Sequence, residues 1–215
     1  MRRTLLFLLA IVYLAAKPAS TNAEELSYED YAIEASQDTA ISNIDINETN
    51  FPDANFRNWL LSQSYGKDGK LTENEIKNIT SIDVKKKNIS TLKGIEYFTS
   101  LKYLSCNSNQ LTFLDVSKNT ELAGLHCYSN QLTSLDVSKN TALTTLDCGD
   151  NKLTSLDVSK NTALEDLLCY SNQLTSLDVS QNTALTTLDC SSNQLTSLDV
   201  SQNTHWIGCF AIPIN

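Results

Sequence analysis

Six cysteines and two histidines are the residues of this 215-residue sequence best suited to nucleophilic, acid–base or metal chemistry. Neither His126 nor His205 has both a nucleophile and an orienting acid beside it, and no glycine-rich segment is suited to cradling a phosphate. The sequence also lacks a Cys-x-x-Cys pair, the spacing typical of structural zinc sites. We therefore expect a protein that is not an enzyme and needs no cofactor.

The cysteines follow a strict spacing. An even number of cysteines in a secreted chain would ordinarily suggest disulfides. Five of them recur every 21 residues, which predicts a single inward-facing column on parallel strands. Neighbours in such a column run side by side, whereas a disulfide needs a closer approach of the Cβ atoms and a suitable torsion. We expect a ladder of buried, reduced thiols at Cys106, Cys127, Cys148, Cys169 and Cys190, with Cys209 outside it.

A second ladder consists of aspartates, also 21 residues apart. Catalytic carboxylate pairs need two environments that push their pKa values apart, and equivalent repeats supply equivalent environments. We therefore interpret this ladder as a solvated face with Ser and Thr neighbours; loose gathering of cations is the alternative. Its members are Asp115, Asp136, Asp157, Asp178 and Asp199.

One segment resembles a calcium-binding loop. If Gly69 is the sixth position of an EF-hand loop, Asp68 and Glu75 fall at positions 5 and 12, where calcium ligands are expected. Ser64 and Gly66 then occupy positions 1 and 3, where they offer no carboxylate or carboxamide. We expect no tight metal site, and Asp68 and Glu75 remain weak calcium candidates.

These residues are positioned by a long internal repeat. From Leu101 onward the pattern L-x-x-L-x-C-x-x-N-x-L-T-x-L-D-V-S-x-N-T recurs every 21 residues, and a 22-residue coil precedes it. Such a period predicts a solenoid, in which each coil buries its Leu, Cys and Val columns against its neighbours. Both halves of the pattern alternate, so we expect a short strand on each side of the coil. Two Asn columns, beginning at Asn109 and Asn119, are expected to satisfy backbone groups where the chain turns.

The repeat pattern resembles the leucine-rich repeat family in its short nested form. The segment before it is similar to the helical caps of secreted bacterial leucine-rich repeat proteins of the internalin-like type. The resemblance implies an α/β-class leucine-rich repeat solenoid that is right-handed and β-rich, with a small N-terminal cap that is helical and degenerate EF-hand-like. It also implies binding of other macromolecules rather than catalysis.

Residues 1–23 have the layout of a cleavable signal peptide. Arg2 and Arg3 precede an apolar run from Leu5 to Ala16, and small residues lead to a cleavage position after Ala23. The run is shorter than the roughly 20 residues of a membrane-spanning helix. We expect a secreted or surface-associated protein with no membrane insertion and no covalent tether.

The rest of the sequence divides into four parts. Residues 24–50 carry acids but no Lys or Arg and are expected to be a disordered linker. Residues 51–78 form the helical cap, residues 79–204 the solenoid and residues 205–215 a degenerate tail, with Trp206 in a Leu column. The net charge of −9 argues against nucleic-acid binding.

One half of the repeat is nearly uniform from coil to coil, and the other half varies. The D-V-S-x-N-T half is almost invariant, whereas outward positions of the L-x-x-L-x-C half vary from coil to coil. Varied columns with aromatic residues are typical of protein interfaces, so we expect a protein or glycan partner there. Drift on an unselected surface would give the same variation, and a structural spacer that self-associates end to end is the alternative function. The predicted contact residues are Tyr103, His126, Tyr128, Leu168 and Tyr170.

Overall fold

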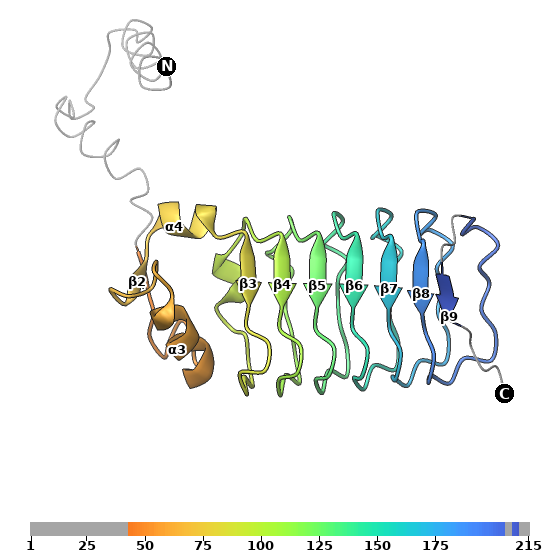
Figure 1. Ribbon diagram of the computed structural model, residues 1–215, viewed down its shortest axis with the longest axis horizontal. Helices are drawn as coiled ribbons and strands as arrows, with labels where there is room; N and C mark the ends of the chain where they lie inside the picture. Colours follow the sequence, from red (N-terminus) through yellow and green to blue (C-terminus); the bar gives the residue numbers. More distant parts are fainter. Residues whose placement is uncertain (1–42, 205–207, 211–215) are drawn as a thin grey trace, which may run out of the picture. The chain divides into compact units, whose positions relative to one another are not determined.

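The computed structural model describes residues 43–204 and 208–210. The predicted signal peptide, most of the acidic linker, and His205 and Trp206 of the tail lie outside these residues. In the described part, a small cap precedes a series of coils whose strands lie side by side (Figure 1).

The cap contains two helices and a short antiparallel pair of strands. Strand β1 (Ile44–Asp45) pairs antiparallel with β2 (Lys70–Leu71). Helix α3 (Ala54–Ser62) begins after Asp53, whose carboxylate accepts hydrogen bonds from the backbone N–H groups of Asn55 and Phe56. Helix α4 (Glu73–Asn78) begins with a capping box between Thr72 and Glu75.

Aromatic packing joins the cap to the first coil. The Phe51 ring lies 5.7 Å from that of Phe56 and 6.4 Å from that of Phe98, and all three side chains are fully buried. Asp53 adds a polar contact, because its second carboxylate oxygen accepts bonds from the backbone N–H and hydroxyl of Ser90, each 2.8 Å long. Burial opposes ionisation of Asp53, but the bonds from Ser90 and Phe56 outweigh it and hold its pKa below the usual value. The cap therefore covers the end of the core that would otherwise be open.

Seven parallel strands form one sheet along the coils, in sequence order. Adjacent strands pair in register, so that Leu104 faces Leu125 and Leu125 faces Leu146. The rest of each coil returns the chain to the start of the next parallel strand. This arrangement confirms the predicted solenoid. The strands are β3 (Ser81–Asp83), β4 (Tyr103–Ser105), β5 (Gly124–His126), β6 (Thr145–Asp147), β7 (Asp166–Leu168), β8 (Thr187–Asp189) and β9 (Gly208–Phe210).

The predicted inward columns form a continuous core. In the coil that begins at Leu122, the side chains of Leu122, Leu125, Cys127 and Val137 have no exposed surface. Each fully buried Leu contributes roughly 1.5–3 kcal/mol, provided that a neighbouring coil covers it. The five column cysteines are buried, as predicted, and Cys106, Cys127, Cys148 and Cys169 are free thiols. The backbone of Cys209 pairs with Leu188, which places it outside that column, at a Leu position.

Both asparagine columns satisfy backbone groups, as predicted. Asn130 donates from Nδ2 to the carbonyls of Cys106 and Cys127, and its Oδ1 accepts the N–H of Leu111. In the second column, Asn140 donates to the carbonyls of Val116 and Asn119, at 3.0 and 2.8 Å. Each asparagine therefore links its own coil to the preceding one.

One prediction about the coils is wrong. The sequence predicts a strand on each side, but on the L-T-x-L-D-V-S side the described coils show only an isolated bridge between Asp115 and Asp136. There, the Asp136 carboxylate accepts the N–H of Ser138 at 2.8 Å, and Asn140 N–H bonds to the carbonyl of Val137. These local bonds bend the chain and take up backbone groups that a ladder would need.

Helices α3 and α4 and the short 3-10 helix η1 (Ile95–Tyr97), which are the helices of the described residues, are all too short to cross a membrane.

Candidate functional site: the variable strand face

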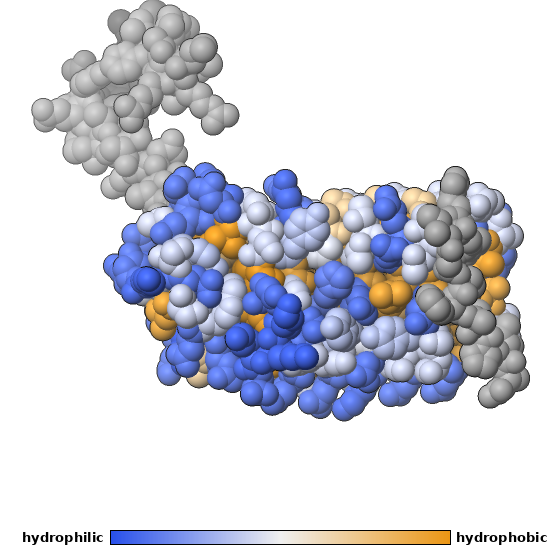
Figure 2. Space-filling view, in the orientation of Figure 1, coloured by the Kyte–Doolittle hydropathy of each residue, from blue (hydrophilic) through white to orange (hydrophobic). Residues whose placement is uncertain are grey.

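The outward side of strands β4–β8, which we name the strand face, carries the columns that vary between coils. In each strand the middle residue, such as Leu125, points into the core, so the residues on either side of it point outward. A third column follows two residues after each strand. Figure 2 shows hydrophobic surface gathered along the middle of the solenoid, between hydrophilic margins. The columns read Tyr103, Gly124, Thr145, Asp166, Thr187; then Ser105, His126, Asp147, Leu168, Asp189; then Asn107, Tyr128, Gly149, Tyr170, Ser191.

All five predicted contact residues come from this face. Tyr103, His126 and Leu168 lie on strands β4, β5 and β7. Tyr128 and Tyr170 lie two residues beyond β5 and β7. Tyr103 is the most open, with 55% of its surface exposed, and the other four are partly buried.

Two of the tyrosine rings pack over glycines of a neighbouring coil. A β-carbon built on Gly124 would lie 2.8 Å from Cδ1 of Tyr103, and one built on Gly149 would lie 2.4 Å from Cε1 and Cζ of Tyr170. Any larger residue at either position would displace the ring. These pairs are not evident from the sequence, although the two glycines are the only residues without a side chain in the variable columns.

A buried carboxylate lies within electrostatic range of the Tyr170 hydroxyl. Asp147 is 7% exposed, and its Oδ1 accepts the N–H of Gly149 at 3.3 Å. Burial raises the pKa of Asp147 and Asp189 raises it further, while the bond from Gly149 and the nearby His126 lower it. The net effect is a raised pKa.

The same surroundings raise the pKa of the Tyr170 hydroxyl. Burial raises its pKa, and the negative charges of Asp147, Asp150 and Asp189 add to the effect. Tyr128 also contributes, which places the two predicted tyrosines within electrostatic range of each other. This part of the strand face therefore has a negative potential around an aromatic ring.

The calcium candidates are engaged in local bonds. Glu75 accepts the backbone N–H and the hydroxyl of Thr72, both at 2.8 Å, and Asp68 accepts the N–H of Lys70 at 3.1 Å. At Gly66 a β-carbon would lie 2.1 Å from the carbonyl oxygen of Leu60, so a carboxylate cannot be placed there without a shift of the backbone. Within 43–204 and 208–210, no three His, Cys, Asp or Glu side chains gather as a metal site.

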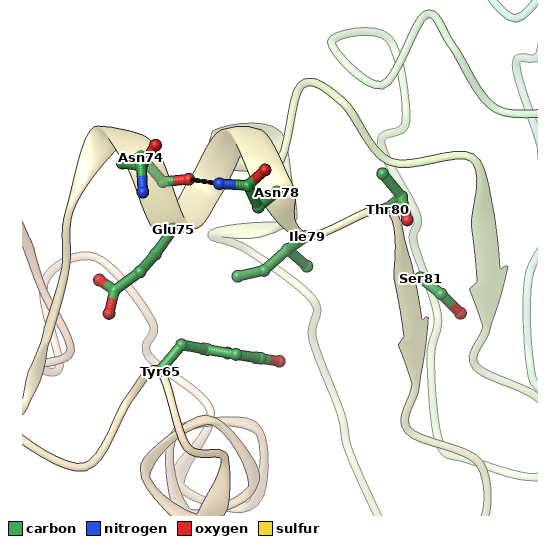
Figure 3. Close-up of a pocket in the computed structure, with 7 residues that line it drawn as sticks. All are labelled: Tyr65, Asn74, Glu75, Asn78, Ile79, Thr80 and Ser81. Atoms are coloured by element: carbon green, nitrogen blue, oxygen red, sulfur yellow. Dashed lines mark hydrogen bonds between the residues drawn. The ribbon is translucent and has the colours of Figure 1, made fainter.

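A second feature, which the sequence analysis missed, is a cavity of about 360 Å³ between α4 and β3 (Figure 3). Burial raises the pKa of Tyr65, one of its lining residues, to about 12. Asn78 bonds across one turn of α4 to the carbonyl of Asn74, at 2.7 Å. No sequence pattern indicates this cavity, because it forms only where the cap meets the first coil. It is lined by Tyr65, Asn74, Glu75, Asn78, Ile79, Thr80 and Ser81.

Several solved structures resemble the chain. An internalin, InlF, from Listeria monocytogenes is 26% identical over 79% of this chain and 52% of its own, with a TM-score of 0.68. A leucine-rich repeat protein from Leptospira interrogans is 26% identical over 65% of this chain and 39% of its own, with a TM-score of 0.58. The functional domain of InlJ from Listeria monocytogenes, described as including a cysteine ladder, is 31% identical over 80% of this chain and 52% of its own, with a TM-score of 0.40.

The chain thus spans about half the length of the two Listeria proteins. No family model and no curated protein matches it. Three findings nevertheless agree: the 21-residue period, the seven-stranded parallel sheet, and the likeness to the InlF and Leptospira structures. The chain is a leucine-rich repeat protein, similar to the internalins.

Proposed function

We propose that this protein is an exported, non-catalytic binding module that recognises a protein or glycan partner through its strand face. The packing of Tyr170 over Gly149 carries this proposal. A ring held in place before binding loses little conformational freedom when a partner contacts it. Aromatic residues of this kind also supply much of the binding energy at protein interfaces.

The surrounding chemistry supports the same interpretation. Partly buried Tyr128, His126 and Leu168 lie on the strand face with Tyr170, so apolar and hydrogen-bonding groups alternate over neighbouring coils. The opposite side repeats nearly the same Thr, Ser and Asp residues in every coil and offers no shaped surface. A module of this kind would act outside the cell, which agrees with the signal-peptide pattern of residues 1–23.

The test is capture of a partner by immobilised protein from surface or host extracts. Tyr128→Ala and Tyr170→Phe should each weaken capture, the first by losing a ring and the second by losing a hydroxyl. The matched control is the pair Asp136→Asn and Asp178→Asn on the opposite side, which should capture the partner normally. Loss of capture in the control pair, with normal capture by both tyrosine variants, would reverse the assignment of faces.

A structural role is the second candidate, and one observation favours it. Among the described strands, β9 pairs only with β8 and ends the sheet. An unpaired edge strand is a template for pairing with another chain. Concentration-dependent association in sedimentation experiments, without saturable capture of any partner, would favour end-to-end assembly over binding through the strand face.

A further inference from the structure

We call the side of the solenoid that carries strands β3–β8 the strand side. The charges along it are unevenly distributed. The segments 143–151, 164–172 and 185–193, which contain β6–β8, carry five acids and no Lys or Arg. Lys152 is the next basic residue after the first of them, and its ammonium donates to Oε1 of Gln131 at 3.5 Å. The five acids are Asp147, Asp150, Glu165, Asp166 and Asp189.

The end of the strand side near the cap carries an excess of positive charge. The segment 79–88 carries three lysines against one aspartate, and exposed Lys102 follows just before β4. Lys85 is paired with Asp83 at 2.9 Å, which leaves its two lysine neighbours as the excess positive charge of that coil. The strand side is therefore electrically bipolar, positive toward the cap and negative over β6–β8.

The negative end also contains a buried carboxylate, that of Asp147, with few hydrogen bonds. Asp147 is 93% buried, and among the described residues its one hydrogen-bond donor is the N–H of Gly149, at a long 3.3 Å. A carboxylate can accept several bonds, so much of its capacity is unused. A cationic donor that reached Asp147 would be strongly favoured, because charge-assisted bonds at partly dry sites are stronger than neutral ones.

The Tyr170 ring lies among these acids. Its position over Gly149 and the electrostatic effect of Asp147, Asp150 and Asp189 on its hydroxyl place an aromatic surface inside the negative region. An aromatic face bordered by carboxylates is suited to a guanidinium or ammonium group, which stacks on the ring and bonds to the acids.

We propose that the partner presents an arginine- or lysine-rich polypeptide segment, which docks over β6–β8 with a cationic side chain between the Tyr170 ring and Asp147. This inference rests on the proposed function and specifies the chemistry of the partner. The positive end of the strand side repels the same segment, which favours docking over β6–β8.

The probe is a fluorescent hexa-arginine peptide, titrated into the full protein at low ionic strength and followed by anisotropy, with hexa-glutamate as the reverse-charge control. The test variant carries Asp147→Asn, Asp166→Asn and Asp189→Asn. The matched variant carries Asp136→Asn, Asp157→Asn and Asp178→Asn, which change the net charge equally on the opposite side. Loss of one buried and two partly exposed carboxylates predicts about a tenfold weakening for the strand-face variant, and the matched variant should stay within about twofold.

Equal weakening by both triple variants, or none by either, would overturn the proposal, as would comparable binding of hexa-glutamate. If the triple strand-face variant does not fold, Asp166→Lys alone reverses a partly exposed charge and should weaken the peptide on its own. If hexa-arginine does not distinguish the faces while partner capture still depends on Tyr128 and Tyr170, the cationic partner is wrong and the proposed function stands. If neither hexa-arginine binding nor partner capture depends on the strand face, the cationic partner and the proposed function are both wrong.

Discussion

The ring of Tyr170 and the backbone of Gly149 are in direct contact across two adjacent coils. A β-carbon at position 149 would lie 2.4 Å from two ring atoms, far inside van der Waals contact. The two residues are therefore one structural unit, since the glycine provides the space that holds the ring.

Gly149→Ala should disturb this unit with little effect on the fold. Gly149 is not in the left-handed backbone region, so alanine fits its backbone, and the group that must move is the end of a side chain. We expect Tyr170 to turn out toward solvent, its raised pKa to fall toward the ordinary value, and partner binding to weaken by more than about fivefold, as for a lost aromatic anchor. Ultraviolet titration of tyrosine and binding measurements check this. The control is Ser134→Ala on the opposite side, and unchanged binding by Gly149→Ala would contradict the role of the ring.

The thiol ladder should be inert in the folded protein. Burial raises the pKa of Cys106 and Cys148 to about 12 and that of Cys127 and Cys169 well above the ordinary value. Because the thiolate is the reactive form, a disulfide-exchange reagent at neutral pH should label these residues only after denaturant is added. Intramolecular disulfides found by mass spectrometry would disprove the ladder of reduced thiols.

The same thiols make stability depend on alkaline pH. Their folded pKa lies above the unfolded value of 9.0, so the unfolded chain releases its protons first. The contribution of the thiols to the free energy of unfolding should be constant below pH 9 and fall as the pH rises from 9 toward 12. Denaturant titrations under reducing conditions measure this. Cys148→Ala should flatten the decline, at the cost of a small cavity, and an unchanged slope would contradict the assignment.

Calcium should have little effect on stability. Glu75 is already bonded to Thr72, and Gly66 cannot be replaced by a ligand residue without a backbone clash. Millimolar calcium should leave the melting temperature nearly unchanged, with magnesium as the control. A stabilisation above about 2.7 kcal/mol, which corresponds to a hundredfold excess over Kd, would show that the loop binds calcium.

Asn161→Ala should destabilise the solenoid. Its Nδ2 donates to the carbonyls of Val137 and Asn140, at 3.0 and 2.9 Å, and the residue is fully buried. Each carbonyl keeps one backbone donor, Asn140 N–H on Val137 and Leu143 N–H on Asn140, so the substitution removes two hydrogen bonds without orphaning an acceptor. The expected loss is roughly 0.5–1.5 kcal/mol for each bond. Urea unfolding measures the loss. Thr162→Ala, at the exposed neighbouring position, is the control and should change stability by less than about 0.5 kcal/mol.

The repetitive part of this fold was predictable because each structural role recurs at a fixed spacing. The buried positions of Leu125 and Cys127 and the bonds of Asn130 follow from a pattern that every coil confirms. The missing second strand could not be found from alternation, since the bond from Ser138 N–H to Asp136 competes locally with pairing.

The candidate site was predictable only in part. Column variation located the strand face and its tyrosines, because outward positions are free to differ. It did not show that Tyr170 lies over Gly149, since side-chain placement between unlike coils depends on which neighbour leaves room. Nor did it show the cavity beside Tyr65, which requires two different parts of the chain to meet.

The asparagine bonds give the solenoid a direction, like that of a polymer with distinct ends. Asn109 donates back to Val84, Asn130 to Cys106 and Asn140 to Val116, so the asparagine amides of each coil satisfy carbonyls of the coil before it. A coil added by duplication therefore brings the amides that finish the coil before it, and the register of the strands is unchanged. Because each coil carries the amides that bond it to the coil before, whole coils can be gained or lost while the other coils keep their sequences. The position of the strand face relative to the cap can therefore shift by one coil at a time.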